Sequence, residues 1–265
     1  MVSLSSILGA LFLSACSLAT PATAAETQNE THVETRPVNA VQYWVNGAGK
    51  VDFVNGPGGQ WSAKWDNPPG GDFVVGKGYR PATDMLFNYS GTFDGENGNA
   101  YLGVYGWSID PLAEYYIIES FGNHNPSDNI YAIGPLGTFQ SDDGTYEIWR
   151  KPRYGDSIVG IASFTQYFSI RTTKRVGGTI NTGNHFRAWD AVGLKLGTKD
   201  SFLMVVEGQQ GTGSANITVG LPPKHPVPET PTDKRRTAFP GPTSTATTTS
   251  QHSTMTTTSR PEPTK

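Results

Sequence analysis

Residues 38–221 consist of short alternating runs of apolar and polar residues, which Gly, Asn, Asp and Pro interrupt every few positions. This spacing is typical of antiparallel strands joined by tight turns. Charged residues make up only 16% of the chain, which disfavours long surface helices built from Glu and Lys. One run alone, from Asn184 to Val192, has apolar residues at helical spacing, and Gly193 marks its end. We therefore predict an all-β fold, a two-sheet β-sandwich with a single α-helix.

The two ends of the chain differ from this central region. The apolar stretch 4–18 is too short to span a membrane, and the Ala-Thr-Ala at 22–24 is a pattern that signal peptidase cuts, so we interpret residues 1–24 as a signal peptide. Residues 13–16 also fit a bacterial lipoprotein box, and this alternative stays open. Residues 25–37 are polar and indicate a flexible segment or pro-segment. Residues 222–265 are rich in Pro, Ser and Thr, which predicts a disordered tail with no binding module.

Composition and charge exclude several kinds of site. Cys16 is the only cysteine, so a mature chain without the signal peptide would have neither a disulfide nor a thiol nucleophile. The net charge of −3 offers no basic surface to nucleic acid. We expect no metal and no organic cofactor, because His, Cys and Asp do not cluster at ligand spacing. We expect a secreted monomer that does not bind membranes. Its N-glycosylation sequons begin at Asn29, Asn88 and Asn216.

Aromatic residues alternate along residues 101–107. A strand over this run would place Tyr101, Tyr105 and Trp107 on one face, and Leu102 and Val104 on the other. The aromatic face suits stacking on the flat apolar faces of sugar rings. Filling the core of the sandwich is the alternative interpretation of the same aromatic residues.

Two glutamates occupy strand-like runs, where carboxylates are uncommon. Glu114 shares a strand face with Tyr116, and Glu207 ends a run of five apolar residues. Cleavage of a glycosidic bond needs two carboxyl groups, one to attack the anomeric carbon or activate water and one to protonate the leaving oxygen. A single glutamate in a strand is most often a surface residue, and we interpret Glu119 and Glu147 in that way. The residues alone leave open whether Glu114 and Glu207 meet.

Seven short motifs, spread over roughly residues 42–219, resemble the family 11 glycoside hydrolases in order and spacing. The resemblance implies a β-jelly roll with a concave substrate cleft. It also implies endo-hydrolysis of β-1,4-xylosidic linkages with retention, with xylan and xylo-oligosaccharides as the binding partners. The motifs are Asn55-Gly-Pro-Gly-Gly-Gln60, Tyr105-Gly-Trp107, Pro111-Leu-Ala-Glu-Tyr-Tyr116, Phe121-Gly-Asn-His-Asn-Pro-Ser127, Phe164-Thr-Gln-Tyr167, Asn181-Thr-Gly-Asn-His-Phe186 and Val206-Glu-Gly208.

The resemblance also implies roles for single residues. Glu114 matches the family nucleophile and Glu207 the general acid/base. Asp72 matches a position beside the acid/base, where Asp accompanies an acidic pH optimum. The positions that match substrate-binding residues of the family are Trp44, Tyr105, Tyr116, Arg153 and Gln166.

Several positions depart from the family pattern. The predicted thumb loop, residues 153–158, lacks the usual proline. Ser201 and Gln209 stand where cleft tyrosines are usual, and we expect weaker contacts with the sugar there. Three alternatives to a xylanase stay open: a transglycosylase, a glucanase on the same jelly roll, and an inactive xylan-binding protein. The last would be marked by the loss of Glu114 or Glu207, and both are present.

Overall fold

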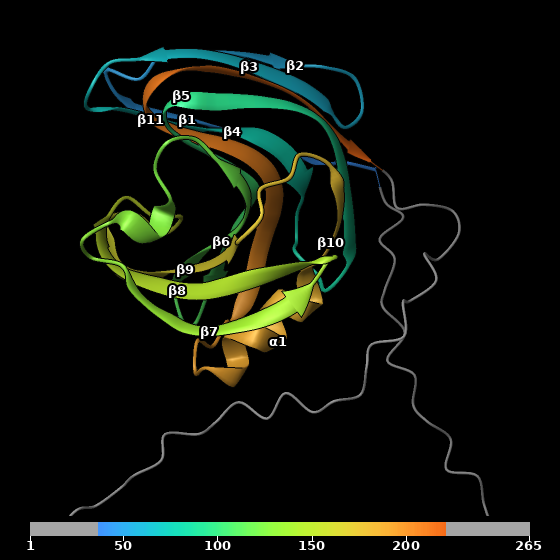
Figure 1. The fold of residues 1–265 in the computed structure, drawn as a ribbon, viewed down its shortest axis with the longest axis vertical. Helices are drawn as coiled ribbons and strands as arrows, with labels where there is room; N and C mark the ends of the chain where they lie inside the picture. Colours follow the sequence, from blue (N-terminus) through green and yellow to red (C-terminus); the bar gives the residue numbers. More distant parts are fainter. Residues whose placement is uncertain (1–36, 221–265) are drawn as a thin grey trace, which may run out of the picture.

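A computed structural model describes residues 37–220 (Figure 1). The predicted signal peptide, nearly all of the segment 25–37, the predicted tail and the sequon at Asn29 lie outside the described residues. The all-β prediction is confirmed, since the described part consists mainly of strands with one α-helix, α1 (Thr182–Ala191). The strands are β1 (Ala40–Gly47), β2 (Val51–Asn55), β3 (Gln60–Asn67), β4 (Gly71–Tyr79), β5 (Leu86–Ile109), β6 (Ala113–Phe121), β7 (Ile133–Ser141), β8 (Gly144–Gly155), β9 (Ala162–Arg171), β10 (Gly178–Asn181) and β11 (Thr198–Gly220), and a 3-10 turn η1 (Pro126–Asp128) follows β6.

The strands form one hydrogen-bonded sheet folded into two layers. The inner layer has the strand order β1-β4-β11-β5-β6-β9-β8-β7. The outer layer is formed by β10, the first half of β5, the second half of β11, then β3 and β2. The predicted sandwich is therefore present, but its two layers are not separate sheets. They share β5 and β11, which are 24 and 23 residues long and pass through both layers.

The bend between the layers follows directly after Glu207 in β11. The pairing of β11 with β5 is shifted between Gly208 and Gln210 and again between Thr212 and Ser214. Such β-bulges bend a strand and increase its twist. Gly211 has a φ of +94°, and a Cβ there would lie 2.1 Å from the Asn97 carbonyl oxygen, so only glycine fits. The corner therefore fixes the position of Glu207 at the end of the inner layer.

The main core fills the space between the layers and continues beneath α1. As predicted, Leu102 and Val104 of β5 point into this core, whereas Tyr101, Tyr105 and Trp107 belong to a second apolar cluster on the concave face of the inner layer. The concave face is therefore lined with aromatic side chains, while the convex face is covered.

The helix α1 packs against the convex face of the inner layer, where Phe186 and Trp189 contact the ring of Tyr115 at centroid distances of 5.6 and 5.8 Å. It begins two residues before the predicted start, because the Asn181 side chain accepts a hydrogen bond from the Asn184 backbone and caps its first turn. No helix within residues 37–220 is long and apolar enough to cross a membrane.

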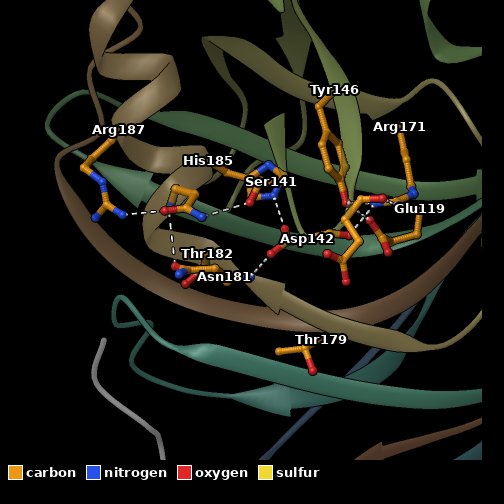
Figure 2. Close-up of polar contacts among 12 residues, drawn as sticks. Glu119, Ser141, Asp142, Tyr146, Arg171, Thr179, Asn181, Thr182, His185 and Arg187 are labelled. Carbon is orange, nitrogen blue, oxygen red and sulfur yellow. Dashed lines mark hydrogen bonds and ion pairs between the residues drawn. The ribbon is translucent and has the colours of Figure 1, made fainter. Parts of the chain in front are cut away.

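A buried polar network lies away from the concave face, near the start of α1 (Figure 2). At its centre is Glu119, whose side chain is 0% exposed. The interpretation of Glu119 as a surface residue is therefore wrong. Its carboxylate accepts hydrogen bonds from the hydroxyls of Tyr89 and Tyr146 and forms an ion pair with Arg175. This arrangement compensates the cost of burying the charge. Glu147 is half-buried and accepts a hydrogen bond from the Trp149 indole.

The same network includes Asp142, in the tight turn between β7 and β8. His185 of α1 lies 2.9 Å from its Oδ2, and the backbone N–H of Asn181 donates to its Oδ1 at 2.8 Å. Burial alone would raise the pKa of Asp142, but the hydrogen bonds from His185 and Asn181 outweigh burial and hold that pKa below its ordinary value. The ionised carboxylate thus ties the β7–β8 turn to the helix.

We expect Asp142→Asn to lower the melting temperature at neutral pH, by an amount corresponding to roughly 1–3 kcal/mol of unfolding free energy. A lowered pKa in the folded state stabilises the fold above the unfolded pKa of about 3.9, and this contribution is lost as the pH falls through the folded value. Melting temperatures from pH 7 down to pH 3 should therefore fall less steeply in the variant than in the wild type.

Asp143→Asn is the matched control, because Asp143 occupies the same turn with a similar φ of 57°, against 54° for Asp142, but is exposed. Asparagine tolerates this backbone conformation, so neither substitution strains the turn. An equal fall in melting temperature in Asp142→Asn and Asp143→Asn would contradict the role given to the Asp142 carboxylate.

Candidate active site

Glu114 and Glu207 lie on the two strands that flank β5. Glu114, in β6, is paired with Trp107 of β5, and Glu207, in β11, is paired with Tyr101 of the same strand. Both side chains point to the concave face, and they are only 7% and 6% exposed. Burial of two carboxyl groups on one face is costly unless other groups compensate it. Their surroundings therefore decide what the pair can do.

The sequence-predicted residues meet in one cavity on the concave face. Every residue predicted to take part in catalysis, substrate binding or pKa modulation lines it. The thumb loop between β8 and β9 contributes further lining residues that the sequence analysis did not assign. The lining consists of Gln42, Trp44, Asp72, Val74, Tyr105, Trp107, Glu114, Tyr116, Arg153, Asp156, Ser157, Ile158, Gln166 and Glu207.

The predicted glycosylation positions that the structure describes lie outside this cavity. Asn88, in β5, is half-buried, and its Oδ1 accepts a hydrogen bond from the Thr179 hydroxyl at 2.5 Å. Asn216, in the outer-layer part of β11, is exposed. A glycan at Asn216 would therefore stand clear of the concave face.

Two phenol hydroxyls hold the carboxyl group of Glu207. Tyr101 donates to Oε1 at 2.7 Å, and Tyr116 donates to Oε2 at 2.9 Å. Tyr116 is in turn stacked on Phe168 at a centroid distance of 5.0 Å with nearly parallel rings. Both oxygens of Glu207 thus have hydroxyl partners, and a hydroxyl can either donate or accept.

Glu114 has phenol partners too, among them Tyr116, and it also has one partner of a different kind. The side-chain amide of Gln166 donates to Glu114 Oε2 at 2.6 Å, and an amide N–H can only donate. Tyr105 also hydrogen-bonds Glu114, and its hydroxyl accepts from the Trp107 indole N–H at 2.6 Å. Trp107 thus supports Tyr105. These donors favour the ionised form of Glu114.

Electrostatic repulsion couples the carboxyl groups of the cavity. Burial and the negative charge of Glu207 raise the pKa of Glu114 to about 7. Burial and the same charge raise the pKa of Asp72 to about 8, although Arg153 acts in the opposite direction. In addition, Asp72 Oδ1 is buried without a hydrogen-bond partner, which favours the protonated carboxyl group. The cluster therefore keeps protons at a pH where exposed carboxyl groups have lost theirs.

Sequence reasoning missed Tyr101 as a site residue. Alternation placed it on the correct face, but nothing in the sequence shows that it pairs with Glu207. Ser201 is paired with Trp107 of β5, is 2% exposed and is not among the residues that line the cavity, so the weaker contact with the sugar at this position stays a prediction. Gln209 lies in the β-bulge after Gly208 and is half-buried, and its Oε1 accepts from the Asn99 side chain at 2.9 Å.

Metal chemistry has no obvious place among the described residues. Within residues 37–220, no three His, Cys, Asp or Glu side chains are grouped so that they could hold a metal ion. The available groups are carboxyl, phenol, amide and guanidinium. Such a set can transfer protons, supply a carboxylate nucleophile and bind hydroxyl groups.

Comparison with known proteins agrees with this geometry. Residues 37–218 match the model of the family "Glycosyl hydrolases family 11". The chain belongs to glycosyl hydrolase family 11.

Curated relatives and a solved structure of this family resemble the chain. An endo-1,4-beta-xylanase B of Penicillium oxalicum is 43% identical over 82% of this chain and 71% of its own length. An endo-1,4-beta-xylanase 11A of Humicola insolens is 46% identical over 67% of this chain and 79% of its own length. A structure of a major Trichoderma reesei endo-1,4-beta-xylanase covers 70% of this chain and 99% of its own, with 38% identity and a TM-score of 0.64. The jelly-roll prediction is thereby confirmed.

The electrostatic coupling in this family 11 site can be measured directly. We expect Glu207→Gln to lower the pKa of Glu114 by about one unit or more, because the neutral amide removes the repulsion that raises it. Carbon-13 NMR of labelled glutamate carboxyl groups would follow the titration. Glu147→Gln, on β8 outside the cavity, should leave the pKa of Glu114 in place. An unchanged titration in Glu207→Gln would mean that burial alone sets that pKa.

Proposed function

We propose that this family 11 hydrolase is a secreted endo-β-1,4-xylanase that cleaves xylan by a retaining double displacement. In this mechanism Glu114 is the nucleophile and Glu207 the general acid/base. The support for it is the difference between the partners of the two buried carboxyl groups. Glu114 accepts from the amide N–H of Gln166, a group that can only donate and so favours the anion, in addition to its phenol partners, whereas both oxygens of Glu207 face phenol hydroxyls, which can donate or accept.

The two groups share one proton during the reaction. Repulsion disfavours the state in which both groups are ionised. In the pH range between the two ionisation steps, the pair therefore holds one proton. When that proton is on Glu207, the charge that raises the pKa of Glu114 is absent. Ionised Glu114 beside protonated Glu207 is therefore a state without repulsion between the two groups. It is also the state that a retaining glycosidase needs.

Each step then follows from these positions. Glu207 gives its proton to the departing glycosidic oxygen while Glu114 attacks the anomeric carbon, and a covalent glycosyl-enzyme forms. Glu207, now ionised, removes a proton from water. The water attacks the same carbon, releases Glu114 and returns the proton to Glu207. Atoms and charges balance over the two displacements, and the product keeps its β-configuration.

Substrate contacts come from the strands and loop around the carboxyl pair. Trp44 of β1 is half-buried at the cavity and offers an indole face to a sugar ring. Arg153 from the thumb side and Gln166 from β9 offer donors to sugar hydroxyls. The xylanase names of the relatives support xylan as the polysaccharide.

Glu114→Gln should lower the rate on xylan by several orders of magnitude without loss of the fold, because an amide cannot form the glycosyl-enzyme. Reducing-sugar release from xylan and from carboxymethyl-cellulose, with melting temperature as the control for folding, would measure this. Proton NMR of the first product of the wild type should show the β-anomer. Residual activity of Glu114→Gln above a tenth of wild type would refute the nucleophile assignment. An initial α-anomer would refute retention. Faster hydrolysis of carboxymethyl-cellulose than of xylan by the wild type would refute xylan as the substrate.

Asp72 adds a pH dependence to this function. Its raised pKa keeps it protonated through the acidic and neutral range. As a neutral acid beside Glu207 it could donate a hydrogen bond to the ionised form of Glu207, which is the form that follows proton donation to the leaving group. We propose that this donor stabilises that form and gives the enzyme an acidic optimum.

Asp72→Asn should move the alkaline limb of the kcat/KM profile upward by roughly one pH unit or more, because an amide is a weaker donor than a carboxylic acid. Profiles on soluble xylan from acidic to mildly alkaline pH would be compared for both proteins. Asp52→Asn, an exposed aspartate on β2, is the control and should leave the profile in place. A near-neutral optimum in the wild type, or an unmoved limb in Asp72→Asn, would refute the role of Asp72.

A further inference from the structure

Tyr101 is placed directly beside Glu207 by the sheet itself. The two residues are cross-strand partners in the pairing of β5 with β11, and the Tyr101 hydroxyl donates to Glu207 Oε1 at 2.7 Å. The side chain is 7% exposed and packs edge-on against the ring of Tyr116 at a centroid distance of 6.0 Å. Its position is therefore fixed by backbone pairing and by packing as well as by the hydrogen bond.

The two oxygens of Glu207 face different surroundings. Tyr116, the partner of Oε2, lines the cavity, whereas Tyr101, the partner of Oε1, is not among the lining residues. Both phenols belong to the aromatic cluster on the concave face, and Tyr101 is 7% exposed against 2% for Tyr116. We assign Oε2, whose partner Tyr116 lines the cavity, to the glycosidic oxygen of the substrate. On that assignment the Tyr101 hydrogen bond to Oε1 persists while substrate is bound.

We propose that Tyr101 is a positioning residue for Glu207, which holds the carboxyl group at Oε1 and stabilises its ionised form during proton donation to the leaving group. This inference rests on the proposed role of Glu207 as the general acid/base. A phenol that donates to a carboxylate stabilises the ionised form, which is the form that Glu207 reaches when it has given its proton to the leaving group. Burial and the negative Glu207 raise the pKa of the Tyr101 phenol well above its ordinary value, so it remains a donor at any working pH.

Other charged and titratable groups surround Glu207, and none of them occupies the position of Tyr101. They come from four strands: Asp72 from β4, Tyr105 from β5, Glu114 and Tyr116 from β6, and Lys151 and Arg153 from β8. Because all of these remain in a Tyr101→Phe variant, a change in the pH profile of that variant would report the single hydrogen bond to Oε1.

The test compares kcat/KM of wild type and Tyr101→Phe on two substrates. Xylohexaose has a poor leaving group that must be protonated, whereas a dinitrophenyl xylobioside has a good one that leaves without an acid. We expect roughly a tenfold loss on xylohexaose and little change on the aryl substrate, because only the first reaction needs the acid. We also expect the alkaline limb on xylohexaose to move to higher pH, since the ionised form of Glu207 has lost a donor.

Tyr89→Phe is the matched control. Tyr89 is also a buried tyrosine of β5, and its hydroxyl donates to the buried carboxylate of Glu119 at 3.1 Å, outside the site. The Tyr89→Phe variant should have a lower melting temperature. The ratio of its kcat/KM values on the two substrates and its pH profile should be those of the wild type. If Tyr101→Phe does not fold, a fluorinated tyrosine at position 101 keeps the shape and is a stronger donor, and it should move the alkaline limb to lower pH.

Equal losses on both substrates with an unmoved alkaline limb would overturn the proposal and leave Tyr101 a structural role only. Glu207→Gln separates this failure from failure of the proposed function. If Glu207→Gln reduces the rate on xylohexaose far more than on the aryl substrate while Tyr101→Phe does not, only the role of Tyr101 is wrong. If Glu207→Gln reduces both rates equally, the acid/base assignment itself is wrong.

Discussion

The backbone pairing of β5 with β11 supports both layers of the molecule. These two long strands run side by side through the inner layer, turn the corner and continue together in the outer layer. Every other strand of the inner layer is arranged on one side or the other of this pair. The same pairing places Tyr101 opposite Glu207, and the next pairing, β5 with β6, places Glu114 on the other side. A slip of one residue in either register would turn a carboxyl group into the core.

Some of this could be predicted from the sequence, because alternation is a local property. The opposite orientations of Tyr105 and Val104 follow from a period of two, and the helix near residue 184 follows from its apolar spacing and the glycine after it. The course of β5 and β11 through both layers could not be predicted, since bulges near Gly208 and Thr212 change the partners of a strand without leaving a clear mark in the sequence. The contact of Tyr101 with Glu207, across 106 positions, was missed for the same reason.

The roles of the glutamates depend on contacts that no local pattern contains. Glu114 and Glu119 lie five positions apart in β6, and both are almost completely buried. Sequence reasoning separated them only through the resemblance to a family, and it placed Glu119 on the surface. What distinguishes them physically is their partners on neighbouring elements. Those partners come from β5, β8, β9, β11 and the segment between β9 and β10, and the fold must be known before they can be named.

The contrast between the two glutamates fits a structural role for Glu119 and the proposed catalytic role for Glu114. Glu119 faces Arg175 and two phenol donors, so its charge is neutralised where it is buried and it ties strands together. Glu114 faces Glu207, another acid, and burial together with the repulsion between the two charges raises its pKa. A single proton held by the pair relieves that repulsion, and the donors around Glu114 favour its placement on Glu207. Proton transfer to and from a substrate requires a carboxyl group that can gain and lose such a proton, and a buried carboxylate paired with arginine does not have this freedom. β6 therefore carries a structural carboxylate towards the core and the proposed catalytic one towards the cavity, an odd number of positions apart.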